Sequence, residues 1–442
     1  MRIEIWQDLT VEGQRAVLAR PALVNDANLA AQVAALIERV RNEGDAALFE
    51  LTAKLDRVEL ASLEVDEAEL DAAAARLTQT QRAAIRAAAA NIETFHRRQI
   101  LAPISVETAV GVRCERVLRP IESVGLYVPA GNAPLPSTAL MLGVPARLAG
   151  CPTRLLCSPP QADGRADPAV LYAARVAGVQ RVFKLGGAQA IAALAYGTET
   201  VPKVDKVFGP GSVWVTEAKA QVDRDPHGAG RDYPAGPSEL LVIADAAASP
   251  AFVAADLLSQ AEHGADSQVL LLTTSAELAS AVAAEVERQK QTLPRRSIVE
   301  GSLGHSRAIV VADLAEAFAI SNRYAPEHLI LQIERPREWL PQVRAAGSVF
   351  LGPWAPETVG DYCSGTNHVL PTYGFARRYS SLGVADFVRS MTVQELTPDG
   401  LRAIGPIATT LATLEGLEAH ARAVTQRLAT LDAPGGRAGD RR

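Results

Sequence analysis

The chain of 442 residues has few cysteines, no excess of positive charge and no long apolar run. Its four cysteines have no paired spacing, which excludes a disulfide framework and is typical of a reducing cytosol. The net charge of −6 argues against nucleic acid, which selects basic surfaces. No apolar segment is long enough to span a bilayer, and the first residues lack the basic and apolar blocks of a signal peptide. These absences predict a cytoplasmic enzyme or binding protein.

What the sequence does contain is a regular alternation of short apolar strands with helical segments. Alternation of this kind predicts parallel sheets that helices cover on both faces. A Gly/Pro-rich loop at 223–237 divides the alternation into two runs, which predicts two doubly wound halves. The expected strands are 123–128, 153–157, 181–186 and 203–208 in the first run, and 239–245, 267–273, 308–312, 327–333 and 347–351 in the second.

The predicted fold class is therefore α/β, with two incomplete Rossmann-like parallel-sheet domains that face a cleft. We expect the first domain to comprise residues 1–128 and 239–381, with a helical N-terminal region, and the second to comprise residues 129–238. Residues 382–432 are expected to form a helical tail that is too small to bury its own leucines, which favours packing on another subunit. The composition of residues 433–442 is typical of disorder.

A polar stretch follows the apolar helical run 250–263. Gln260 and His263 are three residues apart, so they project from one face of the last helical turn. Metal-binding groups at the exit of a buried helix suggest a site, although a histidine there can also cap free carbonyls. With Asp361, from a glycine-bracketed loop, they would form an oxygen and nitrogen donor set suited to zinc or another divalent ion.

Two titratable neighbours, Glu327 and His328, open the expected strand 327–333. Adjacent residues in a strand point to opposite faces, so each side chain can meet a different partner. A proton-transfer reaction could use them as separate bases, His328 near neutral pH and Glu327 if its pKa is raised. The alternative is a solvated pair of charges at a strand end.

Signals for a nucleotide cofactor are weak. The segments 184–189 and 206–212 each end a strand and open a helix, where backbone donors can hold a phosphate. The third glycine of the dinucleotide fingerprint is absent from Gly209-Pro210-Gly211. These turns alone do not separate a cofactor site from structural turns.

Several segments, taken together and in order from about Gln14 to Arg427, closely resemble the histidinol dehydrogenase family. That family oxidises L-histidinol to L-histidine in two steps, with two NAD and one zinc per active site. The matching segments are GLYVP at 125–129, GGAQAI at 186–191, FGPG at 208–211, PAGPSE at 234–239, LSQAEHG at 258–264, APEHL at 325–329 and GTNHVLP at 365–371.

The resemblance implies a role for each matching residue. His328 would take the hydroxyl proton of histidinol, and Glu327 would activate the water that attacks bound histidinal. The zinc would anchor the substrate rather than polarise its alcohol, and His328 would also contact the substrate. The implied zinc ligands, which also bind substrate, are Gln260, His263, Asp361 and His420; the further substrate contacts are Ser238, His368 and Glu415; the NAD contacts are Tyr127, Gln189 and Ser212.

The resemblance also implies a homodimer with intertwined ends, in which Glu415 and His420 enter the active site of the partner subunit. Two positions depart from the family pattern. Ser212 stands where the family often has asparagine, which puts that NAD contact in doubt, and Ala130 replaces a glycine in the loop that approaches the cofactor.

Two other functions are compatible with the same residues. A zinc-dependent hydrolase would use the same metal site, with Glu327 as the base for a metal-bound water. A protein of two α/β lobes could also bind a metal or small molecule without turnover. The hydrolase predicts turnover of an ester or amide without a nucleotide, and the binding protein predicts only stabilisation by its ligand.

Overall fold

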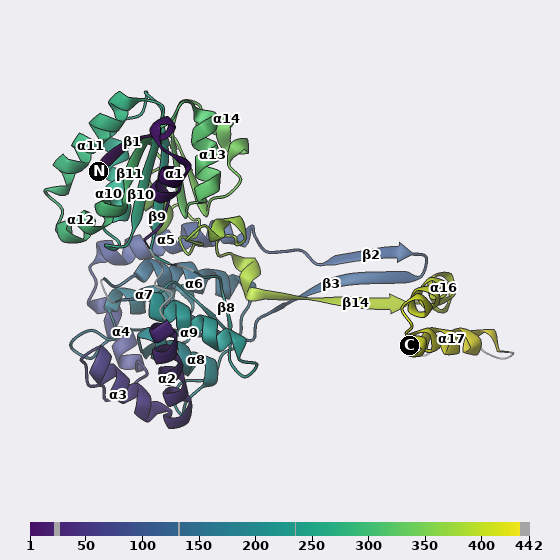
Figure 1. The fold of residues 1–442 in the computed structure, drawn as a ribbon. Helices are drawn as coiled ribbons and strands as arrows, with labels where there is room; N and C mark the ends of the chain where they lie inside the picture. The colour runs from purple at the N-terminus through teal and green to yellow at the C-terminus, as the bar shows by residue number, and fades with distance from the viewer. Residues whose placement is uncertain (22–26, 131–132, 235, 434–442) are drawn as a thin grey trace. The chain divides into compact units, whose positions relative to one another are not determined.

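The computed structural model describes residues 1–21, 27–130, 133–234 and 236–433 (Figure 1). The predicted disordered end, 433–442, lies outside these residues except for Ala433. The chain forms two compact units: the first joins Met1–Gln99 to Ile121–Phe387, and the second joins Ile100–Pro120 to the chain from Val388 onward. Among the described residues, no helix has the length and apolar character needed to cross a membrane.

The first unit contains a six-stranded sheet in which every neighbouring pair is parallel. Its strands are, in spatial order, β1 (Arg2–Ile5), β11 (Arg307–Val310), β10 (Gln268–Thr273), β9 (Glu239–Ala244), β12 (His328–Gln332) and β13 (Ser348–Leu351). All residues of β9, β10 and β12 are buried, as expected for strands covered on both faces.

The same unit contains a five-stranded parallel sheet. Its strands are, in spatial order, β6 (Arg181–Lys184), β5 (Thr153–Ser158), β4 (Ser123–Tyr127), β7 (Lys206–Phe208) and β8 (Gly230–Arg231). The two parallel sheets confirm the predicted α/β class.

Both sheets follow the strand order of a doubly wound nucleotide-binding fold. Counted along the chain from β4, and again from β9, the spatial order is third, second, first, fourth and fifth; β1 adds an edge strand to the larger sheet. The order therefore reverses between β4 and β7 in one sheet and between β9 and β12 in the other. Such folds bind nucleotides at a switch point, outside the carboxyl ends of the strands.

Alternate side chains of β9 build the core on the two faces of the larger sheet. Leu240 and Val242 pack in a cluster with α10, whereas Leu241 and Ile243 pack in a second cluster with Trp6. The helices that follow the strands of this sheet are α10 (Pro250–Ala261), α11 (Ala276–Lys290), α12 (Arg296–His305), α13 (Leu314–Tyr324), α14 (Pro336–Trp339) and α15 (Glu357–Tyr362).

The helical N-terminal region covers the five-stranded sheet. Helix α2 packs on α8 and α9, α4 packs on α7, and α5 packs on α6. Val33 and Leu48 share one apolar cluster with Leu155 of β5. The helices concerned are α2 (Ala27–Glu43), α3 (Asp45–Leu55), α4 (Glu67–Ala75), α5 (Gln79–Arg97), α6 (Pro136–Ala149), α7 (Pro168–Ala177), α8 (Gly187–Tyr196) and α9 (Val213–Arg224). Helix α1 (Val11–Val17) instead packs Val17 against the apolar cluster of the six-stranded sheet.

The structure differs from the predicted boundary after residue 128. Strand β4 pairs with β5 and β7, so it belongs to the five-stranded sheet rather than to the domain of residues 239–381. The N-terminal helices pack on that sheet as well. The spacing of elements along the chain does not encode this, because a central strand of a doubly wound sheet precedes its neighbours on both sides.

The second unit holds an antiparallel sheet that the sequence pattern did not predict. Its order is β14 (Val388–Leu396), β3 (Val112–Pro120) and β2 (Ile104–Ala109), and β14 lies within the segment 382–432 that was expected to be helical. Most residues of β2 and β14 are exposed, so these strands have no buried apolar face in the single chain, and the apolar residues of β14 are irregularly spaced. Helices α16 (Pro398–Leu414) and α17 (Glu418–Asp432) confirm the helical end of the tail.

A buried carboxyl on α10 gives the fold a pH-dependent stability. Asp256 is buried against Gln332, whose Nε2 donates to Asp256 Oδ2 at 3.3 Å, and burial raises the pKa of Asp256 to about 6. A raised carboxyl pKa favours the protonated folded state, so its stabilising effect is lost as the pH rises through about 6.

We therefore expect Asp256→Asn to stabilise the protein increasingly from about pH 4 to about pH 6, and by a constant amount of up to about 3 kcal/mol from there to pH 8. Denaturant unfolding of both proteins across this pH range measures the effect. A difference that is constant across the whole range would contradict the raised pKa.

Candidate active site

The candidate active site lies at the amino edge of the six-stranded sheet. Glu239 is the first residue of β9 and His328 the first residue of β12, and the parallel register sets His328 opposite Leu240. Helix α10 runs back from the carboxyl end of β9, so its last turn returns Gln260, and the loop after it returns His263, to the same edge. The structure thus brings the two predicted bases beside three of the four predicted metal ligands, Gln260, His263 and Asp361.

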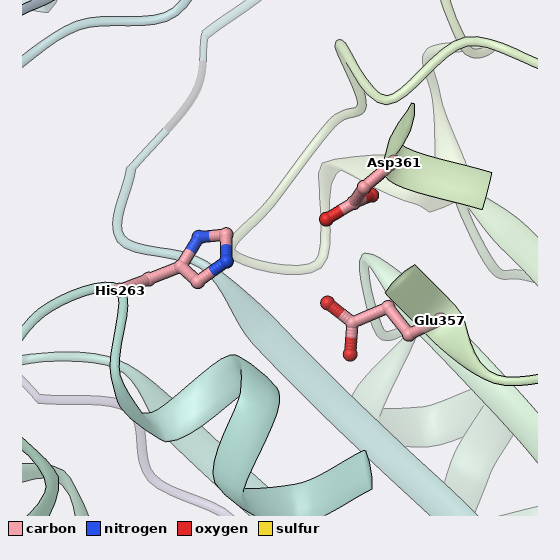
Figure 2. A group of neighbouring side chains, drawn as sticks. All are labelled: His263, Glu357 and Asp361. Atoms are coloured by element: carbon pink, nitrogen blue, oxygen red, sulfur yellow. The ribbon is translucent and has the colours of Figure 1, made fainter. Parts of the chain in front are cut away.

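Three side chains at this edge form a group that could hold a metal ion. One ligand atom each of His263, Glu357 and Asp361 lies within 4.8 Å of the others, and Figure 2 shows the three side chains pointing toward one another. Both carboxylates are buried on α15, whereas His263 is exposed in the loop after α10. Protein atoms around the imidazole displace water and lower the pKa of His263, which keeps it in the neutral form that binds a metal. Oxygen and nitrogen donors of this kind suit zinc or another divalent ion.

Gln260 is fully buried beside this group. Only one orientation of its amide makes hydrogen bonds, and in that orientation the nitrogen donates to both carboxylate oxygens of Glu357, at 3.2 Å to Oε2. The amide oxygen, which is the atom that can bind a metal, then lies on the opposite side of the amide group. Glu357 therefore orients a predicted ligand.

His328 is buried between two partners. Its Nδ1 lies 3.2 Å from the backbone oxygen of Glu239, and its Nε2 lies 3.3 Å from Oδ1 of Asp361. Burial by itself lowers the pKa of His328, but the carboxylates of Glu357, Glu327 and Asp361 outweigh burial and raise it well above its usual value. A bond from Nδ1–H to the carbonyl of Glu239 directs Nε2 toward the metal-binding group.

Glu327 is also buried, and it has one hydrogen-bond donor from the neighbouring strand. The backbone nitrogen of Glu239 donates to Glu327 Oε2 at 2.8 Å. Burial raises the pKa of Glu327 to about 8, although His328 and the hydrogen bond from Glu239 act in the opposite direction. A carboxyl with this pKa can exchange a proton near neutral or mildly basic pH, which the sequence reasoning required of it.

The remaining predicted substrate contacts fall into two groups. Ser238 directly precedes β9, and His368 lies with its Nε2 3.4 Å from Thr138 Oγ1 on α6. Burial lowers the pKa of His368 to about 4, so its imidazole is neutral at physiological pH. Glu415 and His420 belong to the second unit, where Glu415 ends α16 and His420 lies in α17.

The three predicted NAD contacts gather at the carboxyl edge of the five-stranded sheet. Tyr127 ends β4, Gln189 lies in the first turn of α8 after β6, and Ser212 is the residue before α9. The hydroxyl of Tyr127 accepts a hydrogen bond from the backbone nitrogen of Gly187 at 3.0 Å. Tyr127 and Ser212 therefore flank the switch point between β4 and β7.

The glycine after β7 lets the backbone pass close to the end of β4, at the carboxyl edge of the five-stranded sheet. Gly209 has a φ of +123°, and a Cβ atom added there would lie 2.1 Å from the backbone oxygen of Tyr127. Only glycine can hold this backbone conformation at such a close approach.

Sequence reasoning missed Glu357. The signal was present, because Glu357 and Asp361 are four residues apart and share one face of a helix. The segment looked like loop rather than helix, since α15 is short and follows Pro353 and Pro356.

Two parallel sheets with a nucleotide-binding strand order, two buried bases and an oxygen and nitrogen donor group define an α/β enzyme with a candidate metal site. The family profile described as histidinol dehydrogenase matches residues 19–428. The chain belongs to the histidinol dehydrogenase family and is an oxidoreductase.

Individual relatives agree with this assignment over almost the whole chain. Histidinol dehydrogenase of Vibrio cholerae is 58% identical over 431 residues, which cover 98% of this chain and 99% of the relative. That of Xanthomonas axonopodis is 59% identical over 428 residues, with 97% and 99% coverage. The crystal structure of histidinol dehydrogenase from Elizabethkingia anophelis matches with a TM-score of 0.94 at 46% identity, covering 98% of this chain and 99% of that chain.

The donor group predicts stabilisation by a divalent ion. We expect Zn²⁺ at about 100 times its dissociation constant to stabilise the metal-free protein by about 2.7 kcal/mol, and His263→Asn to remove most of that effect. Thermal unfolding with and without Zn²⁺ measures it. His305→Asn is the control, because His305 is an exposed histidine at the end of α12. Equal Zn²⁺ effects on both variants would contradict the site.

Proposed function

We propose that this chain catalyses the NAD-dependent oxidation of L-histidinol through bound L-histidinal to L-histidine, the last steps of histidine biosynthesis. The observation that carries the proposal is the burial of two adjacent bases, Glu327 and His328, beside an oxygen and nitrogen donor group. Membership of the histidinol dehydrogenase family supports the substrate. Two bases in different surroundings suit a reaction with two different deprotonations.

The donor group fits one zinc ion per site. Gln260, His263 and Asp361 would hold the zinc, with His420 of the partner subunit as the fourth ligand. The close buried carboxylates of Glu357 and Asp361 support the assignment, because such a pair needs a cation or a proton to offset its charge. When bound, zinc supplies a positive charge and open positions that anchor the imidazole and amine of the substrate.

His328 is the base of the first step. In its neutral form it takes the hydroxyl proton of histidinol on Nε2, because the contact of Nδ1 with the carbonyl of Glu239 assigns the ring proton to Nδ1. A zinc ion held by the neighbouring carboxylates would offset the charges that raise the pKa of His328, and so would favour that neutral form. Ser238, His368 and Glu415 would complete the binding of the substrate. The neutral imidazole of His368 can accept or donate a hydrogen bond without adding charge.

Glu327 is the base of the second step. It takes a proton from the water that attacks the carbonyl carbon of histidinal, and the hydrated aldehyde is then oxidised to the carboxylate. The backbone donor from Glu239 fixes one carboxylate oxygen, which leaves the other to contact the water. With a pKa of about 8, Glu327 ionises as the pH rises through that value, which favours the second step at mildly basic pH.

NAD would bind at the carboxyl edge of the five-stranded sheet, through Tyr127, Gln189 and Ser212, and would accept the hydride in each step. The close backbone approach at Gly209 and the switch point between β4 and β7 support this location. Ser212 makes no capping hydrogen bond to α9, so its hydroxyl is available to a cofactor.

We further propose a homodimer with shared active sites, in the cytoplasm. The apolar side chains of Ile407, Leu411 and Leu414 on α16 are exposed in the single chain, which supports burial against a partner. The four cysteines are free thiols, which is consistent with a reducing compartment.

The stoichiometry of the reaction tests the proposed function. We expect the protein with Zn²⁺, NAD and histidinol to form two NADH per histidine, and Glu327→Gln to slow oxidation of added histidinal more than the first hydride transfer from histidinol. Stopped-flow absorbance of NADH and amino-acid analysis give these quantities. One NADH per histidinol consumed, with free aldehyde released by the unmodified protein, would refute the two-step reaction.

Complementation tests the shared site. His263→Asn and His420→Asn should each be inactive alone, whereas their mixture should recover about a quarter of the wild-type activity, because half of the randomly exchanged dimers carry one intact site. Mass spectrometry of isotope-labelled subunits would show that exchange has occurred. Exchange without recovery would mean that each site is built from one chain.

A further inference from the structure

We propose that the buried ion pair of Arg20 and Glu239 is a positioning device that holds both bases, Glu327 and His328, in register. The inference rests on the proposed function, because it concerns the residues assigned as bases there. Arg20 has no role in that mechanism, and it is distant in sequence from every other residue of the site. In our account it touches neither substrate nor cofactor, so it is a positioning residue rather than a catalytic one.

Arg20 binds the side chain of Glu239 through two parallel hydrogen bonds. Its Nε donates to Oε1, and its Nη2 donates to Oε2 at 2.9 Å. The side chain of Arg20 is 16% exposed and that of Glu239 only 2%. A two-point contact between a planar guanidinium and a carboxylate fixes direction as well as distance. The backbone nitrogen of Tyr373 also donates to Glu239 Oε1, at 2.8 Å.

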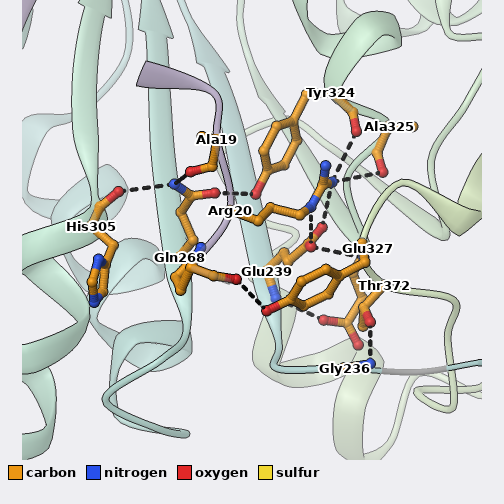
Figure 3. A network of polar contacts seen from close by, with 12 residues as sticks. Ala19, Arg20, Gly236, Glu239, Gln268, His305, Tyr324, Ala325, Glu327 and Thr372 are labelled. Carbon is orange, nitrogen blue, oxygen red and sulfur yellow. Dashed lines mark hydrogen bonds and ion pairs between the residues drawn. The ribbon is translucent and has the colours of Figure 1, made fainter. Parts of the chain in front are cut away.

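The same guanidinium holds the segment that leads into β12. Its Nη2 donates to the backbone oxygens of Tyr324 at 2.9 Å and Ala325 at 3.4 Å, and its Cζ lies 3.9 Å from the centre of the Tyr324 ring. Ala325 has a φ of +54°, a conformation that alanine rarely adopts, so this turn needs support from its surroundings. Glu327 follows two residues later. Figure 3 shows Arg20 between Tyr324 and Glu239.

The backbone of Glu239 contacts both bases. Its nitrogen donates to the carboxylate of Glu327, and its carbonyl oxygen lies 3.2 Å from Nδ1 of His328. Arg20 therefore fixes the start of β9 through a side chain and the entry to β12 through two carbonyls. Any tilt of one strand start against the other changes both base contacts at once.

Stability alone does not explain this arrangement. Replacement of both partners of a buried ion pair by apolar side chains is often neutral for stability, and in some proteins such a pair specifies one geometry. Here the specified geometry is that of the two strand starts from which the bases project. Since rates fall steeply when reacting groups are misplaced by about 1 Å, a loss of this contact should appear in turnover.

The chain offers a matched control in Arg181 and Glu64. Arg181 Nε and Nη2 donate to the two carboxylate oxygens of Glu64 at 2.6 and 2.7 Å, Nη2 also donates to the backbone oxygen of Thr200, and the guanidinium lies 5.1 Å from the ring of Phe183. It thus has the same kinds of contact, although its side chain is more exposed than that of Arg20, at 37%. Arg181 begins β6, at the amino edge of the five-stranded sheet, and has no role in the proposed mechanism.

The experiment compares Arg20→Met, Arg20→Lys and Arg181→Met in the zinc-loaded dimer. For Arg20→Met we expect kcat with histidinol and with histidinal to fall on the order of 10²-fold, with zinc content and the KM for NAD unchanged. Arg20→Lys keeps the charge without the two-point contact, so its kcat should be roughly tenfold higher than that of Arg20→Met. Arg181→Met should lower the melting temperature but leave kcat within about twofold of the wild type.

Each outcome decides the proposal. A kcat per folded protein that is the same for Arg20→Met and Arg181→Met would overturn it, as would a loss of zinc that accounts for the lost activity. If Arg20→Met does not fold, the proposal depends on Arg20→Lys, which must lower kcat without lowering zinc content. Failure of the unmodified protein to convert histidinol would instead refute the proposed function, so the two failures are distinguishable.

Discussion

The site depends on the parallel pairing of β9 with β12, which sets His328 opposite Leu240 and so brings Glu239 and both bases to one edge of the larger sheet. The pairing occurs where the strand order reverses, so the two strand starts are neighbours in space although 89 residues separate their contacts. One backbone residue, Glu239, then serves both bases. The helices α10 and α15 supply the predicted metal ligands, because they return Gln260, His263 and Asp361 to the same edge.

Burial shifts the pKa values of these residues, and so determines when each of them carries a charge. Removal of water raises the pKa of Glu327 to about 8 and lowers that of His368 to about 4, so His368 is neutral at physiological pH and Glu327 becomes a base as the pH rises through about 8. The same burial makes the close carboxylates of Glu357 and Asp361 unfavourable without a cation. Burial at the amino edge of the six-stranded sheet thus both favours the binding of a cation and shifts the pKa values of the bases.

Much of this could be predicted from the sequence, because it follows from local spacing. The three-residue spacing of Gln260 and His263 and the pair at the start of β12 were visible in the chain, and the structure brings them together. Arg20 could not be found in this way, since its contact with Glu239 spans 219 residues and depends on which strands become neighbours. The exposed strand β14 could not be recognised because its apolar residues, Val388, Met391, Val393 and Leu396, do not alternate strictly with polar ones.

The central claim is that Glu327 adds one water to an aldehyde that stays bound between the two oxidations. Mass spectrometry of histidine formed from histidinol in H₂¹⁸O tests it most directly. The account predicts one ¹⁸O atom in the carboxylate, because one oxygen comes from the alcohol and the other from the activated water. Two ¹⁸O atoms would contradict the account, because they would show that the aldehyde exchanges its oxygen with solvent before the second oxidation.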